Sequence, residues 1–121
     1  MRIRPANAAD TTEVARIVRD AYTMYIARIG KPPGPMLDDY ATLIRSHCVW
    51  VAGDPIAGLI VLLPEADHLL LDNVAVDPAA RGTGLGRALM QFADAEAARR
   101  GYSELRLYTH QMMTENIALY A

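Results

Sequence analysis

Residues 74–86 read V-A-V-D-P-A-A-R-G-T-G-L-G. An apolar strand here passes through a short Asp-Pro loop into three glycines that open a helix. Gly82, Gly84 and Gly86 leave little side chain in the way, so backbone N–H groups and the positive end of the following helix can face an anion. The stretch therefore predicts a strand, a loop and a helix that together hold phosphate.

Two familiar phosphate-binding motifs fit this spacing poorly. A Walker loop requires Lys and then Ser or Thr after its last glycine, whereas Arg87 and Ala88 follow Gly86, and this excludes the motif. A dinucleotide fingerprint has the spacing G-x-G-x-x-G, but here the third glycine comes one residue early. The acidic residue that follows, Glu104, lies at the start of the next predicted strand, which disfavours a dinucleotide site.

The pattern R-x-x-G-x-G at residues 81–86, after a strand that ends in Val-Asp-Pro, resembles the acyl-CoA loop of the GNAT superfamily of N-acetyltransferases. A second motif, N-I-A-L-Y at residues 116–120, resembles the helix that carries the catalytic tyrosine in many members. The resemblance covers about residues 2–121 and is specific from residue 69 onward. It implies an acyltransferase that moves an acetyl group from acetyl-CoA to a primary amine of a small molecule or peptide.

Strands and helices alternate along the chain, which predicts an α/β fold with a central mixed sheet flanked by helices. D-T-T-E at residues 10–13 has the spacing of a capping box before a first helix, and the prolines and glycines of residues 30–35 end that helix. Strands are expected at 3–5, 48–52, 56–63, 68–76 and 103–109, and further helices at 37–45, at 85–100 and at 113–120. Residues 53–55 predict an antiparallel hairpin, and the last strand is expected to lie parallel to its predecessor.

Length and composition indicate one domain over residues 1–121. The hydrophobic fraction is 52%, and no apolar run approaches the roughly 20 residues that cross a bilayer. The N-terminus has no secretory signal pattern, and Cys48 is the single cysteine, expected to be a buried inert thiol. With a net charge of −2 and no broad basic face, we expect a cytoplasmic protein that binds neither nucleic acid nor membrane.

The resemblance also implies which residues hold acetyl-CoA. The pyrophosphate would lie against the loop, and the backbone of the preceding strand would pair with the pantetheine arm. Asn116 would hydrogen-bond the cofactor or orient the nearby tyrosine, or would be an ordinary surface residue. The residues expected to bind the cofactor are Val74, Ala75, Val76, Arg81, Gly82, Thr83, Gly84, Leu85, Gly86, Arg87 and Asn116.

Acetyl transfer to an amine needs a base and an acid. Tyr120 is the candidate acid, because a tyrosine hydroxyl stays protonated at neutral pH. Asp72 is the candidate base; it stands two residues before Val74, which predicts that both side chains share one strand face. A salt-bridged Asp72 without a catalytic role, a base formed by ordered water, and His110 remain alternatives.

The acceptor pocket is usually built in this family from the first helix, the loop after it and the last helix. Residues expected to line it here are Tyr22, Tyr25, Met36 and His110, although the Tyr/Met pattern, which includes Tyr40, also fits a core. His47 and His68 have no carboxylate or cysteine partners at ligand spacing, so no metal is expected.

The chain stops at Ala121, before the turn and two strands that usually follow the tyrosine in this family. The missing strands would leave a sheet edge exposed. The sequence is then a truncated form, a natural short form, or a chain whose sheet a partner completes, for example in a homodimer. Two other functions stay open: a non-catalytic acyl-CoA-binding or regulatory module, and an acetyltransferase of protein N-termini.

Overall fold

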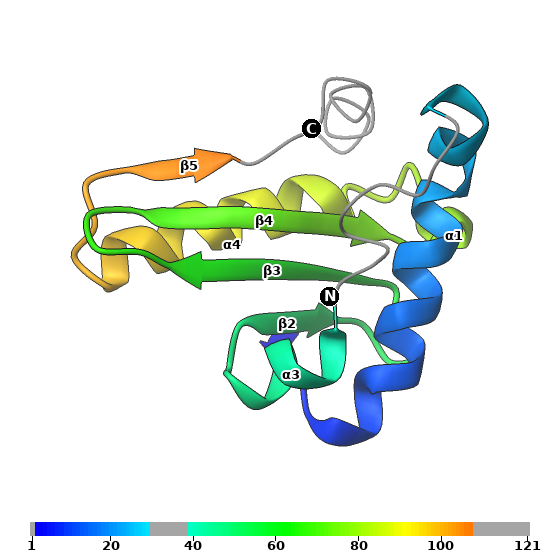
Figure 1. Ribbon diagram of the computed structural model, residues 1–121, viewed down its shortest axis with the longest axis horizontal. Coiled ribbons are helices and arrows are strands. Elements are labelled where there is room, and N and C mark those ends of the chain that lie inside the picture. The colour runs from blue at the N-terminus through cyan, green and yellow to red at the C-terminus, as the bar shows by residue number, and fades with distance from the viewer. Residues whose placement is uncertain (1, 30–38, 108–121) are drawn as a thin grey trace.

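The computed structural model describes residues 2–29 and 39–107, with the backbone alone at 22–29 and 107. Its centre is a five-stranded sheet in the order β1-β2-β3-β4-β5 (Figure 1). The strands are β1 (Ile3–Pro5), β2 (Val49–Ala52), β3 (Gly58–Pro64), β4 (Leu69–Val76) and β5 (Leu105–Leu107). Neighbours from β1 to β4 are antiparallel, and β5 is parallel to β4, so the mixed sheet and the hairpin predicted from sequence are confirmed.

Helices cover both faces of the sheet. Helices α1 (Thr11–Ile29) and α3 (Tyr40–Arg45) lie on one face, and α4 (Leu85–Arg99) lies on the other (Figure 1). Two 3₁₀ turns, η1 (Ala8–Asp10) and η2 (Pro78–Ala80), precede α1 and α4. We call the two sides of the sheet the α3 side and the α4 side.

Helix α1 begins at Thr11, as predicted, but the capping box is one turn earlier than predicted. Asn7 caps η1, and Asp10 accepts a hydrogen bond from the Asn7 backbone N–H at 2.8 Å. Asp10 also accepts a hydrogen bond from Arg4 of β1 at 2.8 Å. Its carboxylate therefore binds the turn and the strand, whereas the predicted box would have it accept from the backbone N–H of Glu13. The prediction of a box over residues 10–13 was therefore wrong, because Asp10 is the last residue of the box and not the first.

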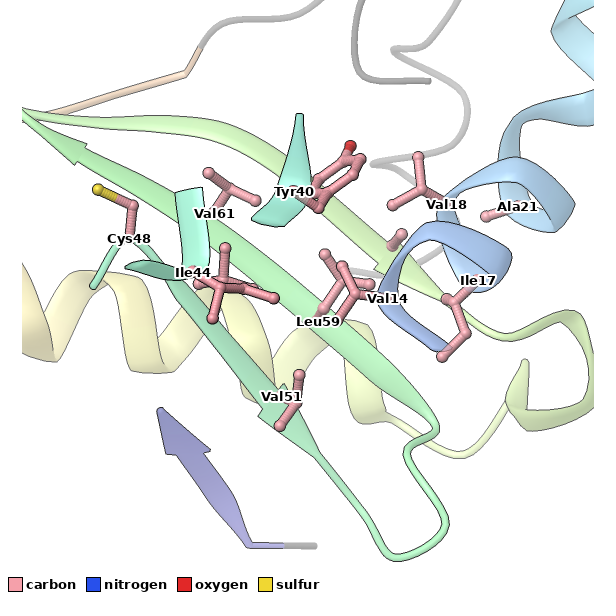
Figure 2. Close-up of a cluster of buried hydrophobic side chains, with 12 residues drawn as sticks. Val14, Ile17, Val18, Ala21, Tyr40, Ile44, Cys48, Val51, Leu59 and Val61 are labelled. Carbon is pink, nitrogen blue, oxygen red and sulfur yellow. The ribbon is translucent and has the colours of Figure 1, made fainter. Parts of the chain in front are cut away.

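The core on the α3 side is formed by the apolar face of α1. Val14, Ile17, Val18 and Ala21 recur at helical spacing and are at most 1% exposed. They pack with residues of α3 and the sheet, among them Tyr40, Ile44, Val51, Leu59 and Val61 (Figure 2). Cys48 belongs to this core, and burial raises the pKa of its thiol, which confirms the predicted buried cysteine.

The core on the α4 side contains Leu85, Leu89 and Ala93, as the spacing along this helix predicted. They pack against sheet residues that include Ile60, Leu62, Val74 and Val76. Phe92 is half-buried, and its ring centroid lies 5.6 Å from that of Trp50. Gly101 follows the helix with φ of 82°, the conformation expected where glycine ends a helix.

Helix α3 starts at Tyr40 rather than at residue 37, because Asp39 is its N-cap and accepts a hydrogen bond from the Thr42 backbone N–H. The strand predicted at 103–109 is β5 within the described residues. The helix predicted at 113–120 lies outside them.

Candidate functional site

The glycine loop between β4 and α4 is open to solvent. Gly82 and Gly84 have φ of 81° and 82°, a left-handed conformation that residues with a Cβ rarely adopt. A Cβ built on either glycine would meet nothing within 4 Å, so these glycines leave free space above the backbone. Gly84 is the N-cap of α4 and supplies no side-chain cap. The loop thus presents bare backbone at the positive end of a helix.

Backbone amides at the start of α4 have no backbone acceptor among the described residues. They include those of residues 84–86, and the first backbone bond of the helix is donated by Ala88 to Gly84 at 3.1 Å. N–H groups at a helix start are normally satisfied by a cap, by water or by a ligand. Arg81 and Arg87 are exposed on either side and add positive charge. Donors, helix dipole and arginines together form an anion-binding geometry.

The strand that leads into the loop has its side chains buried. Val74, Ala75 and Val76 are at most 1% exposed, so only their backbone can serve a ligand. In the part of the chain that the structure describes, β5 pairs with β4 at residues 69–71 only.

A β-bulge interrupts β4 at the position of the candidate base. Val61 pairs with Asn73, but the next residue of β3, Leu62, pairs with Leu71, so Asp72 is the extra residue. Leu71 and Val74 both belong to the core on the α4 side. Asp72 lies on the α3 side, where it lines a hollow with residues of α3. The expectation that Asp72 and Val74 share one face was wrong, because the bulge shifts the alternation by one residue.

The hollow on the α3 side lies between α3 and the strands β3 and β4. It has a volume of about 420 Å³ and is lined by Asp39, Thr42, Leu43, Leu63 and Asp72. Asp39 holds the start of α3 with a carboxylate oxygen that accepts from the Thr42 hydroxyl at 2.8 Å, and this bond lowers the pKa of Asp39. The hollow therefore combines two carboxylates with apolar walls.

Tyr40 and Asn73 form a buried polar pair at the base of this region. The Asn73 side-chain amide donates to the Tyr40 hydroxyl at 3.1 Å, and the two residues are 4% and 3% exposed. The pair ties α3 to the bulge. Tyr40 is thus a core residue with its hydroxyl bonded, which confirms the core interpretation of this tyrosine.

Several residues expected at the site lie outside the described part of the chain. The residues expected to supply the acid, a cofactor contact or the acceptor pocket, Tyr120, Asn116, His110 and Met36, fall in residues 30–38 and 108–121. Tyr22 and Tyr25 stand on α1, whose side chains are described only up to Ala21. Their roles stay predictions.

The sequence contained an unused signal for the bulge. In L-L-L-D-N-V-A-V, two polar residues stand together in an otherwise apolar strand, and a regular strand would send one of them into each core. The other residues of the hollow, such as Thr42 and Leu63, carry no such signal, because their positions depend on how α3 packs on the sheet.

Metal-binding clusters and membrane-spanning helices are both absent from residues 2–29 and 39–107. No three His, Cys, Asp or Glu side chains gather in a way that could hold a metal ion. None of the helices described there has the length and hydropathy that a membrane span requires.

Comparison with known proteins places this geometry in context. Residues 45–121 match the family model described as an acetyltransferase (GNAT) domain. N-acetyltransferase family 8 member 3 of Rattus norvegicus is 35% identical over 95 residues, which cover 70% of this chain and 42% of the relative. The chain therefore spans about two fifths of the length of this curated relative.

Solved structures share the fold. The PaiA N-acetyltransferase of Thermoplasma acidophilum, crystallised in complex with coenzyme A, superposes with a TM-score of 0.78 at 20% identity, covering 98% of this chain and 85% of that one. The ribosomal-protein-S18-alanine N-acetyltransferase of Escherichia coli gives a TM-score of 0.73 at 24% identity, covering 98% and 73%. At such identities the likeness concerns the arrangement of helices and strands.

Proposed function

Because this chain belongs to the GNAT superfamily of acetyltransferases, we propose that it transfers an acetyl group from acetyl-CoA to a primary amine by direct attack in a ternary complex. The acceptor would be a small molecule or a peptide. The observation that carries the proposal is the run of amides at residues 84–86 that have no backbone acceptor among the described residues, at the start of α4. A pyrophosphate matches such a run in charge and in its need for several donors.

The loop and the end of β4 would hold the cofactor together. Residues 82–86 would donate N–H groups to the pyrophosphate, and Arg81 and Arg87 would add charge. The backbone of residues 74–76 would pair with the pantetheine arm as an added strand does. The side chain of Leu85 would stay in the core and keep the first turn of α4 in place, since it is 5% exposed.

The acceptor amine would enter the hollow on the α3 side. Asp72 stands at the bulge, between the cofactor part of β4 and this hollow, so its carboxylate is suited to accept the proton that the amine loses. The amine nitrogen would form a bond to the thioester carbonyl carbon as the carbon–sulfur bond breaks. Tyr120 would protonate the departing sulfur, and Asn116, one turn earlier, would orient it; both assignments rest on the resemblance of the N-I-A-L-Y motif.

The experiment that tests cofactor binding is calorimetric titration of acetyl-CoA, with NADH and ATP as controls. Gly84→Glu places a negative charge in the anion-binding geometry and is expected to weaken acetyl-CoA binding by about a hundredfold or more, or about 2.7 kcal/mol. Gly101→Glu is the matched control, because Gly101 also has φ of 82° and also has nothing within 4 Å of a built Cβ. It carries the same strain and charge at the other end of α4.

The outcomes separate the candidate functions. Selective acetyl-CoA binding that Gly84→Glu removes and Gly101→Glu keeps supports the proposed site, and a folded chain that binds no acetyl-CoA overturns it. A panel of small amines and of peptides with free N-termini then tests turnover. Binding without turnover of any amine would favour the non-catalytic acyl-CoA module, and turnover of peptides alone would favour an acetyltransferase of protein N-termini.

A further inference from the structure

Asp77 connects β4 to the glycine loop and is fixed at three points. Its backbone N–H donates to the Ala57 carbonyl at 2.8 Å, and one carboxylate oxygen accepts from the Ala79 N–H at 3.1 Å. The other oxygen accepts from Arg16 Nη2 at 2.9 Å. Arg16 stands on α1, 61 residues earlier in the chain. The guanidinium therefore joins the helix on the α3 side to the connection that leads into the loop.

Arg16 is itself held by its own helix before it reaches Asp77. Glu13 accepts from Arg16 Nε and Nη2, both at 3.1 Å, and Asp20 accepts from Nη1 at 3.0 Å. These residues lie one turn before and one turn after Arg16, so the guanidinium is oriented from both sides. The hydrogen bond from Arg16 also holds the pKa of Asp77 below its ordinary value, so the pair stays charged to a lower pH.

The position of Asp77 passes to the loop through short contacts. The Ala80 N–H donates to the Asp77 carbonyl at 2.7 Å, which closes η2. The Thr83 hydroxyl then donates to the Ala80 carbonyl at 2.7 Å. Two successive hydrogen bonds thus connect Asp77 through Ala80 to Thr83, which lies in the glycine loop. Asp77 is therefore bonded into the same short connection that carries Gly82 and Gly84.

We propose that Arg16 is a positioning residue for the cofactor: by holding Asp77 as the cap of η2, it presets the amides of residues 82–86 for the pyrophosphate. The inference rests on the proposed function, since it concerns the same anion-binding loop. A loop that is ordered before binding loses less conformational entropy when the ligand arrives, and this strengthens binding without any added contact. Arg16 would act through Asp77 and would not touch the cofactor.

The test compares two arginines that each bind an aspartate of a 3₁₀ turn, Asp10 in η1 and Asp77 at the cap of η2. Arg16→Met removes the link to Asp77 together with the ion pairs to Glu13 and Asp20, and it keeps much of the apolar stem. Arg4→Met is the matched control, because Arg4 binds Asp10 at 2.8 Å with a similar exposure of the arginine, 39% against 33% for Arg16, at a place remote from the glycine loop in sequence. Urea unfolding reports the loss of stability in each variant, and calorimetry reports the dissociation constant for coenzyme A.

We expect Arg16→Met to weaken coenzyme A binding about tenfold and Arg4→Met to change it less than about twofold. Hydrogen exchange in the absence of ligand should become faster in Arg16→Met alone at the amides of Ala79 and Ala80, which both bond to Asp77. Asp77→Asn should weaken binding in the same direction, and the double variant should lose little more than either single variant, because both remove one interaction.

Each result decides a different point. An Arg16→Met protein with wild-type affinity and wild-type exchange at Ala79 and Ala80 overturns the positioning role, as does a double variant whose losses simply add. A wild-type protein that is folded but does not bind coenzyme A overturns the proposed function itself, and the positioning role with it. Arg16→Lys, which keeps the charge without the forked geometry, should recover part of the affinity.

Discussion

The two sides of β4 differ in how their candidate sites are assembled. On the α4 side, the candidate cofactor site uses residues 74–87 in one uninterrupted stretch, from the end of β4 through η2 and the glycines to the start of α4. On the α3 side, the hollow gathers residues from the cap of α3, from β3 and from the bulge of β4. A contiguous site depends on local backbone geometry, whereas an assembled one depends on the packing of distant elements. Changes on the two sides should therefore alter different steps of the reaction.

The largest effect is expected from Asp72→Asn. If Asp72 accepts the amine proton, kcat should fall by about 10²- to 10⁴-fold, because that is the range that a positioned general base contributes. The dissociation constant for acetyl-CoA should stay within about twofold, since the carboxylate lies on the other side of β4 from the core that supports the loop. Steady-state kinetics with the best amine of the panel, together with calorimetry, measure both quantities.

Asp39→Asn is the control for that variant. Asparagine keeps a side-chain oxygen for the cap of α3, and Asp39 has no assigned part in proton transfer. Its kcat should remain close to that of the wild type. A wild-type kcat in Asp72→Asn, or an equal fall in both variants, would count against Asp72 as the base.

A smaller effect is expected from Gly58→Ala, which tests how the helix seat supports the loop. A Cβ on Gly58 would lie 2.9 Å from Leu85 Cδ2 and 3.1 Å from the Ala75 carbonyl oxygen. Overpacking of this kind costs about 1–3 kcal/mol of unfolding free energy. Because Leu85 begins α4, the loop should also shift, and affinity for acetyl-CoA should fall together with stability. Loss of stability with unchanged affinity would show that the loop does not depend on this contact.

The smallest effect is expected from Glu96→Gln, toward the other end of α4. Arg99 and Arg100 hold the pKa of Glu96 at about 2, with Arg99 the larger cause. Because the pKa is lower in the folded state, the carboxylate contributes stability above its unfolded pKa of about 4.5, and this contribution is lost as pH falls toward 2.

Urea unfolding at several pH values measures this contribution. The wild type should lose on the order of 1 kcal/mol more than Glu96→Gln over that interval, a figure reduced by the exposure of Arg99. Affinity for acetyl-CoA at neutral pH should not change. A variant with the same acid sensitivity as the wild type would show that this cluster contributes little, and a change in affinity would show that the far end of the helix reaches the loop.

The fold was predictable from sequence wherever one periodicity dominated. The strands, the hairpin and the face of α4 marked by Leu85 and Leu89 follow from alternation and helical spacing. The capping box was misplaced because the sequence alone does not say which backbone N–H the Asp10 carboxylate accepts from. Asp10 could cap or be capped, and only the contact with Arg4 and the Asn7 amide decides between these roles.

The site divides in the same way. The glycine loop could be predicted, because Gly82 and Gly84 permit the positive φ values and the free space that the loop shows. The hollow was not, because Thr42, Leu43 and Leu63 are ordinary core-edge residues until α3 is placed on the sheet. The sequence around Arg16 indicated only a helix of mixed charges. The link from Arg16 to Asp77 joins positions 61 residues apart, so no local sequence pattern predicts it.

The bulge in β4 has a consequence for chain length. Leu71 lies in one core and Asn73 bonds to α3 in the other, so the strand would alternate regularly if Asp72 were simply absent. A chain with this single deletion should fold with both cores in phase, and circular dichroism with urea unfolding would detect its failure to do so. We therefore expect the sheet to form without this residue, but the proposed general base would be lost. Asp72 is thus an extra residue that adds a carboxylate to a strand whose alternation is regular without it.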